Sequence, residues 1–125
     1  MAGEVHFPPN IQLSETDMTQ INHKRGATFA YQFEIPDDIK DGYFASWTPH
    51  AQLRKRGSDQ DSGLIANLTA EWDSLKTTRH VLIGHPITEH WPLGEAELDI
   101  LFVSSSGFRI RSETIRVTIE RGITR

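Results

Sequence analysis

Hydrophobic and polar residues alternate most regularly in the last third of the chain, within Gly94–Glu120. Two apolar series at period two stand there: Ala96, Leu98, Ile100 and Phe102, and then Ile115, Val117 and Ile119. Between them, Ser104–Gly107 supplies residues that favour a tight turn. Period-two alternation on both sides of such a turn predicts an antiparallel hairpin with one buried face.

Shorter alternating runs upstream predict further strands. They are a short edge strand at Met18–Ile21 and strands at Thr28–Ile35, Trp47–Arg56, Leu64–Trp72 and Arg79–Gly84. A helix competes at Leu64–Trp72, where Ala, Leu and Glu are good helix formers, but strict alternation favours a strand. With the hairpin this makes about seven strands, with turn signals roughly every ten residues. The pattern predicts an all-β fold, a single antiparallel β-sandwich of Ig-like or jelly-roll-like type, with a partly open barrel as the related alternative.

Two segments lack this alternation. Residues 1–17 contain the Pro8–Pro9 pair and no sustained period, which predicts an extended N-terminal arm outside a sandwich domain at residues 18–125. In an assembly, Phe7 and Ile11 of this arm are candidates for docking on a neighbour; a loose terminus is the alternative. In the second segment, His85–Leu93, we expect Thr88 to cap a single helical turn before Trp91.

Length and composition narrow the functional classes. The 125 residues suffice for one domain. A net charge of −4 argues against a nucleic-acid-binding protein, and no stretch approaches the ~20 apolar residues of a membrane span. Cysteine is absent, which excludes disulfides, thiolate metal sites and thiol nucleophiles. The N-terminus lacks the pattern of a secretory signal, so we expect synthesis in the cytoplasm.

Candidate catalytic and metal-binding residues are few. His80, His85 and His90 are spaced by five residues, which suits neither one face of a helix nor one face of a strand, so we interpret them as surface and loop residues. We interpret a series of carboxylates on the outer face of the hairpin as a charge ladder with arginines of the following strand. These residues are Glu95, Glu97 and Asp99 on one strand and Arg109, Arg111 and Arg116 on the next. With no nucleophile elbow and no phosphate-binding glycine motif, the sequence predicts no enzyme, no metal and no cofactor.

Aromatic and basic residues suggest contact surfaces instead. We expect the three tryptophans, Trp47, Trp72 and Trp91, to pack in the core or at its rim. A platform for sugar rings is the less favoured alternative. The basic triplet Arg54-Lys55-Arg56 at a strand end is a candidate docking patch. The candidate interaction residues are Phe7, Ile11, Arg54, Lys55, Arg56 and Trp91.

Four ordered motifs carry a resemblance to a known family. They are Arg25-Gly26-Ala27-Thr28-Phe29; Asp41-Gly42 with Trp47 and Ala51-Gln52-Leu53-Arg54; Thr88, Trp91-Pro92, Gly94 and Ala96-Glu97-Leu98-Asp99-Ile100; and Phe102, Ser104, Gly107, Arg111-Ser112-Glu113-Thr114 and Val117. Over residues 20–124 the chain resembles small tailed-bacteriophage virion proteins associated with the tail, baseplate or fibres. It also resembles the Ig-like N-terminal domain of siphophage upper-baseplate proteins. The resemblance implies a β-sandwich structural module of the virion without catalysis, and transfers no functional residues, because the shared positions are turns and core.

These observations lead to four functional hypotheses. The first is a tail- or baseplate-associated virion adaptor, made in the host cytoplasm, homo-oligomeric and bound to other virion proteins. The second is a capsid decoration (cement) protein that bridges capsomers through the arm. A carbohydrate-binding module using the tryptophans is third, and a small hydrolase or metal-dependent enzyme using the three histidines is last.

Overall fold

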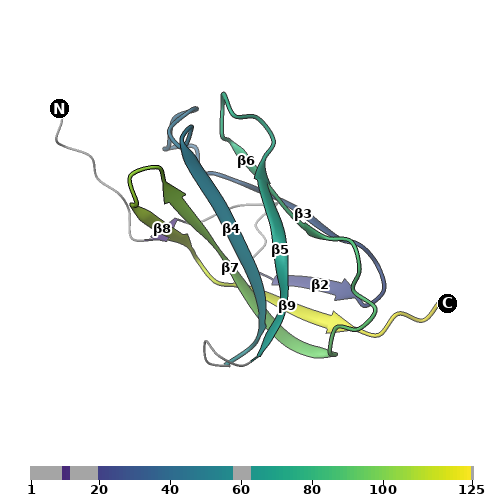
Figure 1. Cartoon of the computed structure of the whole chain (residues 1–125). Helices are drawn as coiled ribbons and strands as arrows, with labels where there is room; N and C mark the ends of the chain where they lie inside the picture. Colours follow the sequence, from purple (N-terminus) through teal and green to yellow (C-terminus); the bar gives the residue numbers. More distant parts are fainter. Residues whose placement is uncertain (1–9, 12–19, 58–62, 125) are drawn as a thin grey trace.

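The computed structural model describes residues 10–11, 20–57 and 63–124, which form nine strands and no helix (Figure 1). The strands are β1 (Asn10–Ile11), β2 (Gln20–Lys24), β3 (Phe29–Glu34), β4 (Trp47–Lys55), β5 (Leu64–Trp72), β6 (His80–His85), β7 (Gly94–Ser104), β8 (Arg109–Ser112) and β9 (Ile115–Glu120). The predicted all-β sandwich is therefore confirmed, and the strand signal at Leu64–Trp72 prevails over the competing helix.

Two sheets share one strand. In the larger sheet, β4 pairs with β7, and the other side of β7 is covered by β8 and β9. The smaller sheet has the order β5-β6-β3. Strand β5 belongs to both: residues up to Leu68 pair with β4, and residues from Thr69 onward pair with β6 (Figure 1). This strand closes one side of the sandwich, while β2 and β3 lie at the opposite side.

A proline explains where β5 leaves β4. The carbonyl of Trp47 accepts a hydrogen bond from the indole of Trp72, and the amide of Lys55 donates to the carbonyl of Gly63. The backbone N–H and C=O groups of the odd-numbered residues of β4 therefore point toward β5. Pro49 is one of these residues and has no N–H to offer. Pairing between β4 and β5 is accordingly confined to Ala51–Arg54.

The alternating apolar residues form the core between the sheets, as predicted. The predicted inward residues of the hairpin and the phenylalanines of β3 are buried. Phe44, in the loop before β4, is fully buried and packs its ring against Phe102 and Trp72, with centroids 5.3 and 5.8 Å away. This loop residue belongs to the core although no periodic pattern marks it.

The second strand of the hairpin is divided, which raises the strand number above the predicted seven. The register pairs Leu98 with Ile115 but Leu101 with Arg111, so three steps on β7 correspond to four on its partner. The extra residue makes a bulge. The Ser112 hydroxyl repairs the ladder there: it accepts from the amide of Ile100 at 2.9 Å and donates to the carbonyl of Glu113.

The N-terminal strands pair in parallel, unlike the rest of the sandwich. β2 lies along β9 from Gln20 to Lys24, and β1 lies beside Arg111 and Ser112 of β8. Strand β1 falls within the predicted arm, whose other residues lie outside the described part of the chain.

In His85–Leu93, where a single helical turn capped by Thr88 is expected, the structure has no helix but one hydrogen-bonded turn, in which the amide of Trp91 donates to the carbonyl of Thr88 at 3.1 Å. Thr88 is buried, and its hydroxyl accepts from the amide of Gly26 and donates to the carbonyl of Ala27, both at 2.8 Å. It therefore ties this segment to the turn before β3 instead of capping a helix. Pro92, which has no N–H, follows this turn and opposes its extension into a helix.

Candidate functional site

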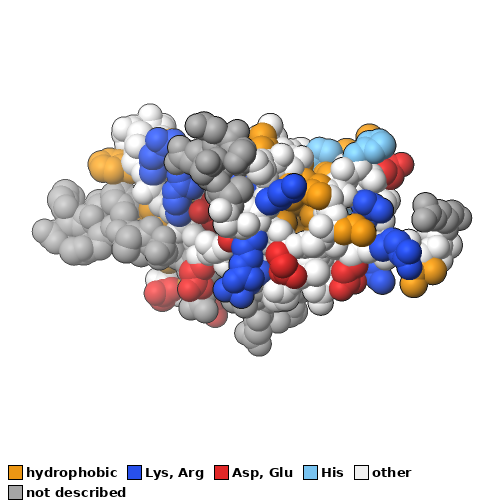
Figure 2. Space-filling model, turned by 90° about the horizontal axis from the view of Figure 1, so that it is seen from below, with side chains coloured by type: hydrophobic (Ala, Val, Ile, Leu, Met, Phe, Trp, Pro, Cys, Tyr) orange, Lys and Arg blue, Asp and Glu red, His pale blue; other side chains and the backbone are white. Residues whose placement is uncertain are grey.

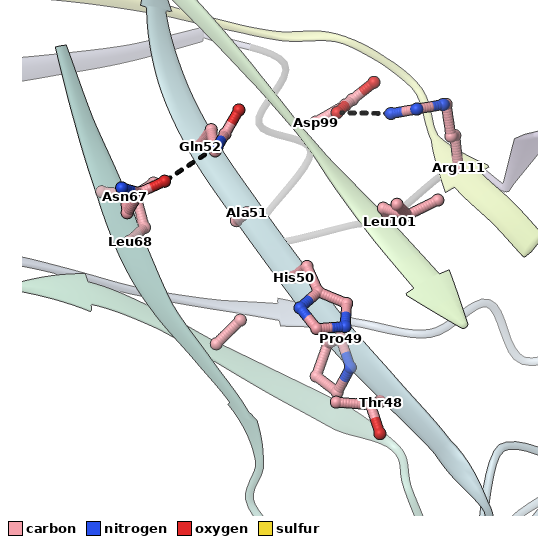
Figure 3. Close-up of a pocket in the computed structure, with 11 residues that line it drawn as sticks. Thr48, Pro49, His50, Ala51, Gln52, Asn67, Leu68, Asp99, Leu101 and Arg111 are labelled. Carbon is pink, nitrogen blue, oxygen red and sulfur yellow. Dashed lines mark hydrogen bonds and ion pairs between the residues drawn. The ribbon is translucent and has the colours of Figure 1, made fainter. Parts of the chain in front are cut away.

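A groove of about 610 Å³ lies on the outer face of the larger sheet, at the fork where β5 leaves β4. Figure 3 shows its lining residues coming from β4, β5, β7 and β8. They are Thr48, Pro49, His50, Ala51, Gln52, Asn67, Leu68, Ala70, Asp99, Leu101 and Arg111. The groove falls in the size range of ligand pockets, about 300–1,000 Å³, but is open along the sheet face.

Amide side chains fix one wall of this groove. Gln52 donates from Nε2 to Oδ1 of Asn67 at 2.8 Å, which joins β4 to β5 (Figure 3). Arg54 donates to Oε1 of the same Gln52, also at 2.8 Å. With both ends of its amide engaged, Gln52 is held in one orientation, while the amide nitrogen of Asn67 points away from Gln52 (Figure 3).

An ion pair and an apolar floor complete the groove. The Arg111 guanidinium lies 3.5 Å from the Asp99 carboxylate, joining β8 to β7 (Figure 3). His50, two residues before Gln52 on β4, stands opposite Leu101 in the β4–β7 register (Figure 3). The groove thus offers amide donors, both signs of charge, an imidazole and an apolar strip.

The predicted charge ladder is confirmed in part. Asp99 pairs with Arg111, and Glu97 lies opposite Arg116 in the register of β7 and β9. Glu95 instead accepts a hydrogen bond from the Thr118 hydroxyl. The face in Figure 2 shows basic and acidic side chains interspersed along its length, without a continuous field of one sign.

The predicted basic triplet is divided between two environments. Arg54 is bonded to Gln52 of the groove, whereas Lys55 and Arg56 are exposed at the end of β4. Phe7 lies outside the described residues. Ile11 is placed only as part of the backbone of β1.

Packing in the core, the favoured interpretation of the tryptophans, is confirmed. Trp47 and Trp91 are 7% and 5% exposed, and Trp72 is half-buried with its indole N–H on the Trp47 carbonyl. The ring of Trp91 packs on Phe29 at a centroid distance of 5.3 Å. A side chain so enclosed leaves little surface for a partner, which removes the basis for Trp91 as an interaction residue and for a tryptophan sugar platform.

The three histidines of the metal-dependent enzyme hypothesis lie in separate surroundings. His80 lies 3.2 Å from the Asp73 carboxylate, His85 packs on Trp91, and His90 is exposed. Among the residues that the structure describes, no three His, Asp or Glu side chains are grouped so as to hold a metal ion.

His23, a residue that sequence reasoning did not single out, is a buried histidine. It is 3% exposed; its Nε2 lies 2.9 Å from the Ala27 carbonyl and its Nδ1 lies 3.1 Å from the Tyr31 hydroxyl. Because a carbonyl only accepts, Nε2 carries the hydrogen and Nδ1 accepts from Tyr31. Burial lowers the pKa of His23, since desolvation disfavours the imidazolium. Its place beside Ile21 at period two is the sequence signal for an inward side chain.

Comparison with known proteins identifies the fold. No family model and no curated protein matches the chain. CopC from Methylosinus trichosporium OB3b is similar in structure, with a TM-score of 0.54 and 10% identity over 93% of this chain and 99% of CopC. A chicken TCR is also similar, with a TM-score of 0.55 and 11% identity over 92% of this chain and 57% of the TCR chain.

In the described part of the chain no helix is long and apolar enough to cross a membrane. At such low sequence identity, the structural similarity concerns the fold alone. The chain therefore has an Ig-like β-sandwich fold.

Proposed function

We propose that this protein is a non-enzymatic structural protein of a tailed-phage virion, located at the tail or baseplate, which acts as an adaptor through protein–protein contacts. The observation that carries the proposal is the preformed groove across β4, β5, β7 and β8, whose side chains are held by one another. An open, rigid surface with donors, acceptors and an apolar strip suits a polar protein contact.

The positions behind the family resemblance support a structural module. Gly26, Gly42, Gly94 and Gly107 all have positive φ angles, between 84° and 120°, which only glycine adopts readily in such turns. Trp91 and most of the apolar residues of the motifs are buried. Most of these shared residues shape the sandwich, whereas three outward-facing ones, Gln52, Asp99 and Arg111, line the groove.

The chemistry of the groove favours contact over catalysis. Its one carboxylate, Asp99, is paired with Arg111, whereas acid–base catalysis of the two-carboxylate kind needs a second carboxylate in the same cleft. Gln52 and Asn67 are neutral amides that donate and accept hydrogen bonds without changing charge. Such groups recognise a partner's backbone and polar side chains.

The direct test is immunogold labelling of intact virions of the phage that encodes the chain. We expect gold particles at the tail or baseplate. Labelling over the head would support the capsid decoration hypothesis instead. Virions that carry no label, although the antibody detects the protein in lysates of infected cells, would contradict a virion role of either kind. Particles of a phage without the gene provide the control.

A further inference from the structure

Strand β3 is the edge strand of the smaller sheet. Its register with β6 runs from Phe29 opposite His85 to Glu34 opposite His80. The ladder continues with the amide of Ile35, which donates to the carbonyl of Arg79 at 2.8 Å. The backbone N–H and C=O groups of odd-numbered residues of β3 therefore point toward β6. In an antiparallel ladder these groups alternate, so those of Ala30, Gln32 and Glu34 point away from β6. No described strand pairs with that side of β3.

This edge lacks the features that usually prevent pairing. Natural edge strands are protected by lysine, proline, bulges or inward-pointing charges. Strand β3 has no lysine or proline, and its register with β6 is regular over all six residues. Ala30 and Gln32 are exposed and uncharged, and the only charge, Glu34, stands at the end of the strand.

We propose that β3 pairs with β3 of a second copy of this chain, antiparallel and about a two-fold axis, with Gln32 opposite Gln32 of the second copy. Only even-numbered residues have backbone groups available, so hydrogen-bonded pairs form between even positions. Centring on Gln32 places Ala30 opposite Glu34 of the second copy and so uses every outward-facing residue of the strand. Each two-fold-related contact then occurs twice, as an isologous interface requires.

The charges at the two ends of β3 favour this antiparallel arrangement. Arg25 lies in the turn that precedes the strand, and Lys24 ends β2 just before it, with its ammonium 3.8 Å from the Glu120 carboxylate. Glu34, Asp37 and Asp38 lie at its end and in the loop that follows, and both aspartates are exposed. Antiparallel pairing brings the basic end of one copy beside the acidic end of the other at both ends of the interface. Parallel pairing would bring like charges together.

The outer face of the proposed pair has no like charges directly opposite each other. Glu34 faces the small side chain of Ala30 of the second copy, and it lies diagonal to the amide of Gln32 of that copy, which can donate to it. The edge also adjoins a shallow groove of about 310 Å³ that includes Ala30, Gln32, Leu82 and Gly84. Pairing of strands this short buries less than the roughly 1,200 Å² of a stable complex, so we expect a reversible dimer.

A cysteine at the two-fold position gives the sharpest test. Hydrogen-bonded residues of an antiparallel pair have Cα atoms about 5.5 Å apart, within disulfide range. The natural chain has no cysteine, so Gln32→Cys introduces a single thiol. Under mild oxidation of the folded protein we expect Gln32→Cys to form a disulfide-linked dimer about tenfold faster than Ser105→Cys, because pairing raises the effective concentration of the thiols. Ser105 is the control, since it is exposed in the turn between β7 and β8 and lies outside both β3 and the groove. Equal rates for the two variants would overturn the proposal.

A second variant tests reversible association without covalent chemistry. Gln32→Lys sets two lysines opposite each other at the two-fold axis, and its long side chain remains in solvent. In analytical ultracentrifugation at rising concentration, we expect the natural chain and the control Ser105→Lys to dimerise and Gln32→Lys to remain monomeric. A natural chain that stays monomeric, as expected if this edge takes a strand of a different protein, contradicts the proposal. So does a dimer unaffected by Gln32→Lys. Neither result bears on the virion role, which immunogold labelling tests separately.

Discussion

His23 shows how one buried side chain joins the N-terminal edge strand to the rest of the sandwich. It lies on β2 and contacts Tyr31 of β3 and the carbonyl of Ala27, so it bridges the side of the sandwich where the two sheets are not joined by a shared strand. The rings of Phe29 and Trp91 surround it at centroid distances of 5.0 and 5.9 Å. Burial favours its neutral imidazole, in which the hydrogen lies on Nε2 and Nδ1 accepts from Tyr31.

The stability of the fold should therefore depend on pH through His23. Its pKa is lowered in the folded state, so between that pKa and the ordinary value of about 6.5 the unfolded chain binds more protons. The free energy of unfolding should be fully retained above pH 6.5 and fall as the pH drops below it, until the folded-state pKa is passed. Urea unfolding of the natural chain and of His23→Gln from pH 8 to 5 measures this.

The exposed His90 provides the control for this prediction. His90→Gln should keep the pH dependence of the natural chain, whereas His23→Gln should lose the His23 contribution and be less stable at pH 8 by about 1–3 kcal/mol. If both variants follow the same pH profile as the natural chain, His23 does not carry the effect.

At the scale of elements, alternation predicted the strands but not the way they are joined. Every predicted strand exists within a few residues of its expected ends, and His50, Gln52 and Arg54 face outward from β4 as predicted. The pattern could not show that β5 serves two sheets, because a strand that changes sheets keeps the same period. It also gave no sign of the parallel pairing of β1 and β2, which depends on distant partners.

The candidate groove also depends on how the strands pair, so the sequence predicts it only in part. The pairing of Asp99 with an arginine of the following strand came from outward-facing charges on adjacent strands. The approach of Asn67 to Gln52 depends on the β4–β5 register, in which the bulge at Leu53 and Arg54 shifts the strands. Residues in contact across such a register carry no local sequence signal.

The loop after β3 is held by one arginine, which gives a prediction at this scale. The Arg79 side chain, 16% exposed, donates to the carbonyls of Ile35, Pro36 and Ile39 and to the Asp41 carboxylate at 2.8 Å. A lysine has no planar fork and cannot satisfy all these acceptors. Arg79→Lys should lower the free energy of unfolding by about 1–3 kcal/mol in urea denaturation. Arg109→Lys, at an exposed position, should change it by less than about 0.5 kcal/mol; equal effects would show that the hydrogen bonds of Arg79 do not stabilise the loop.

At the scale of the whole molecule, the sandwich presents two different surfaces. The larger sheet exposes a polar groove with fixed amides and an ion pair, and the smaller sheet exposes an unprotected strand edge. We assign the groove to neighbouring virion proteins and the edge to a second copy of the chain. Because they lie on different sheets, one copy can use both at once, which is what an adaptor within an oligomeric assembly requires.

The most direct test of the groove as the contact surface is the incorporation of groove variants into virions. Asn67→Arg breaks the bond to Gln52 and places a long charged side chain in the groove, and Asn22→Arg makes the same change at an exposed position of β2 outside it. After complementation of a phage lacking the gene, we expect the Asn67→Arg protein in purified particles to fall at least about tenfold, a loss of about 1.4 kcal/mol of binding, with Asn22→Arg close to natural levels. Undiminished incorporation of folded Asn67→Arg protein would contradict the claim that the groove is the contact surface.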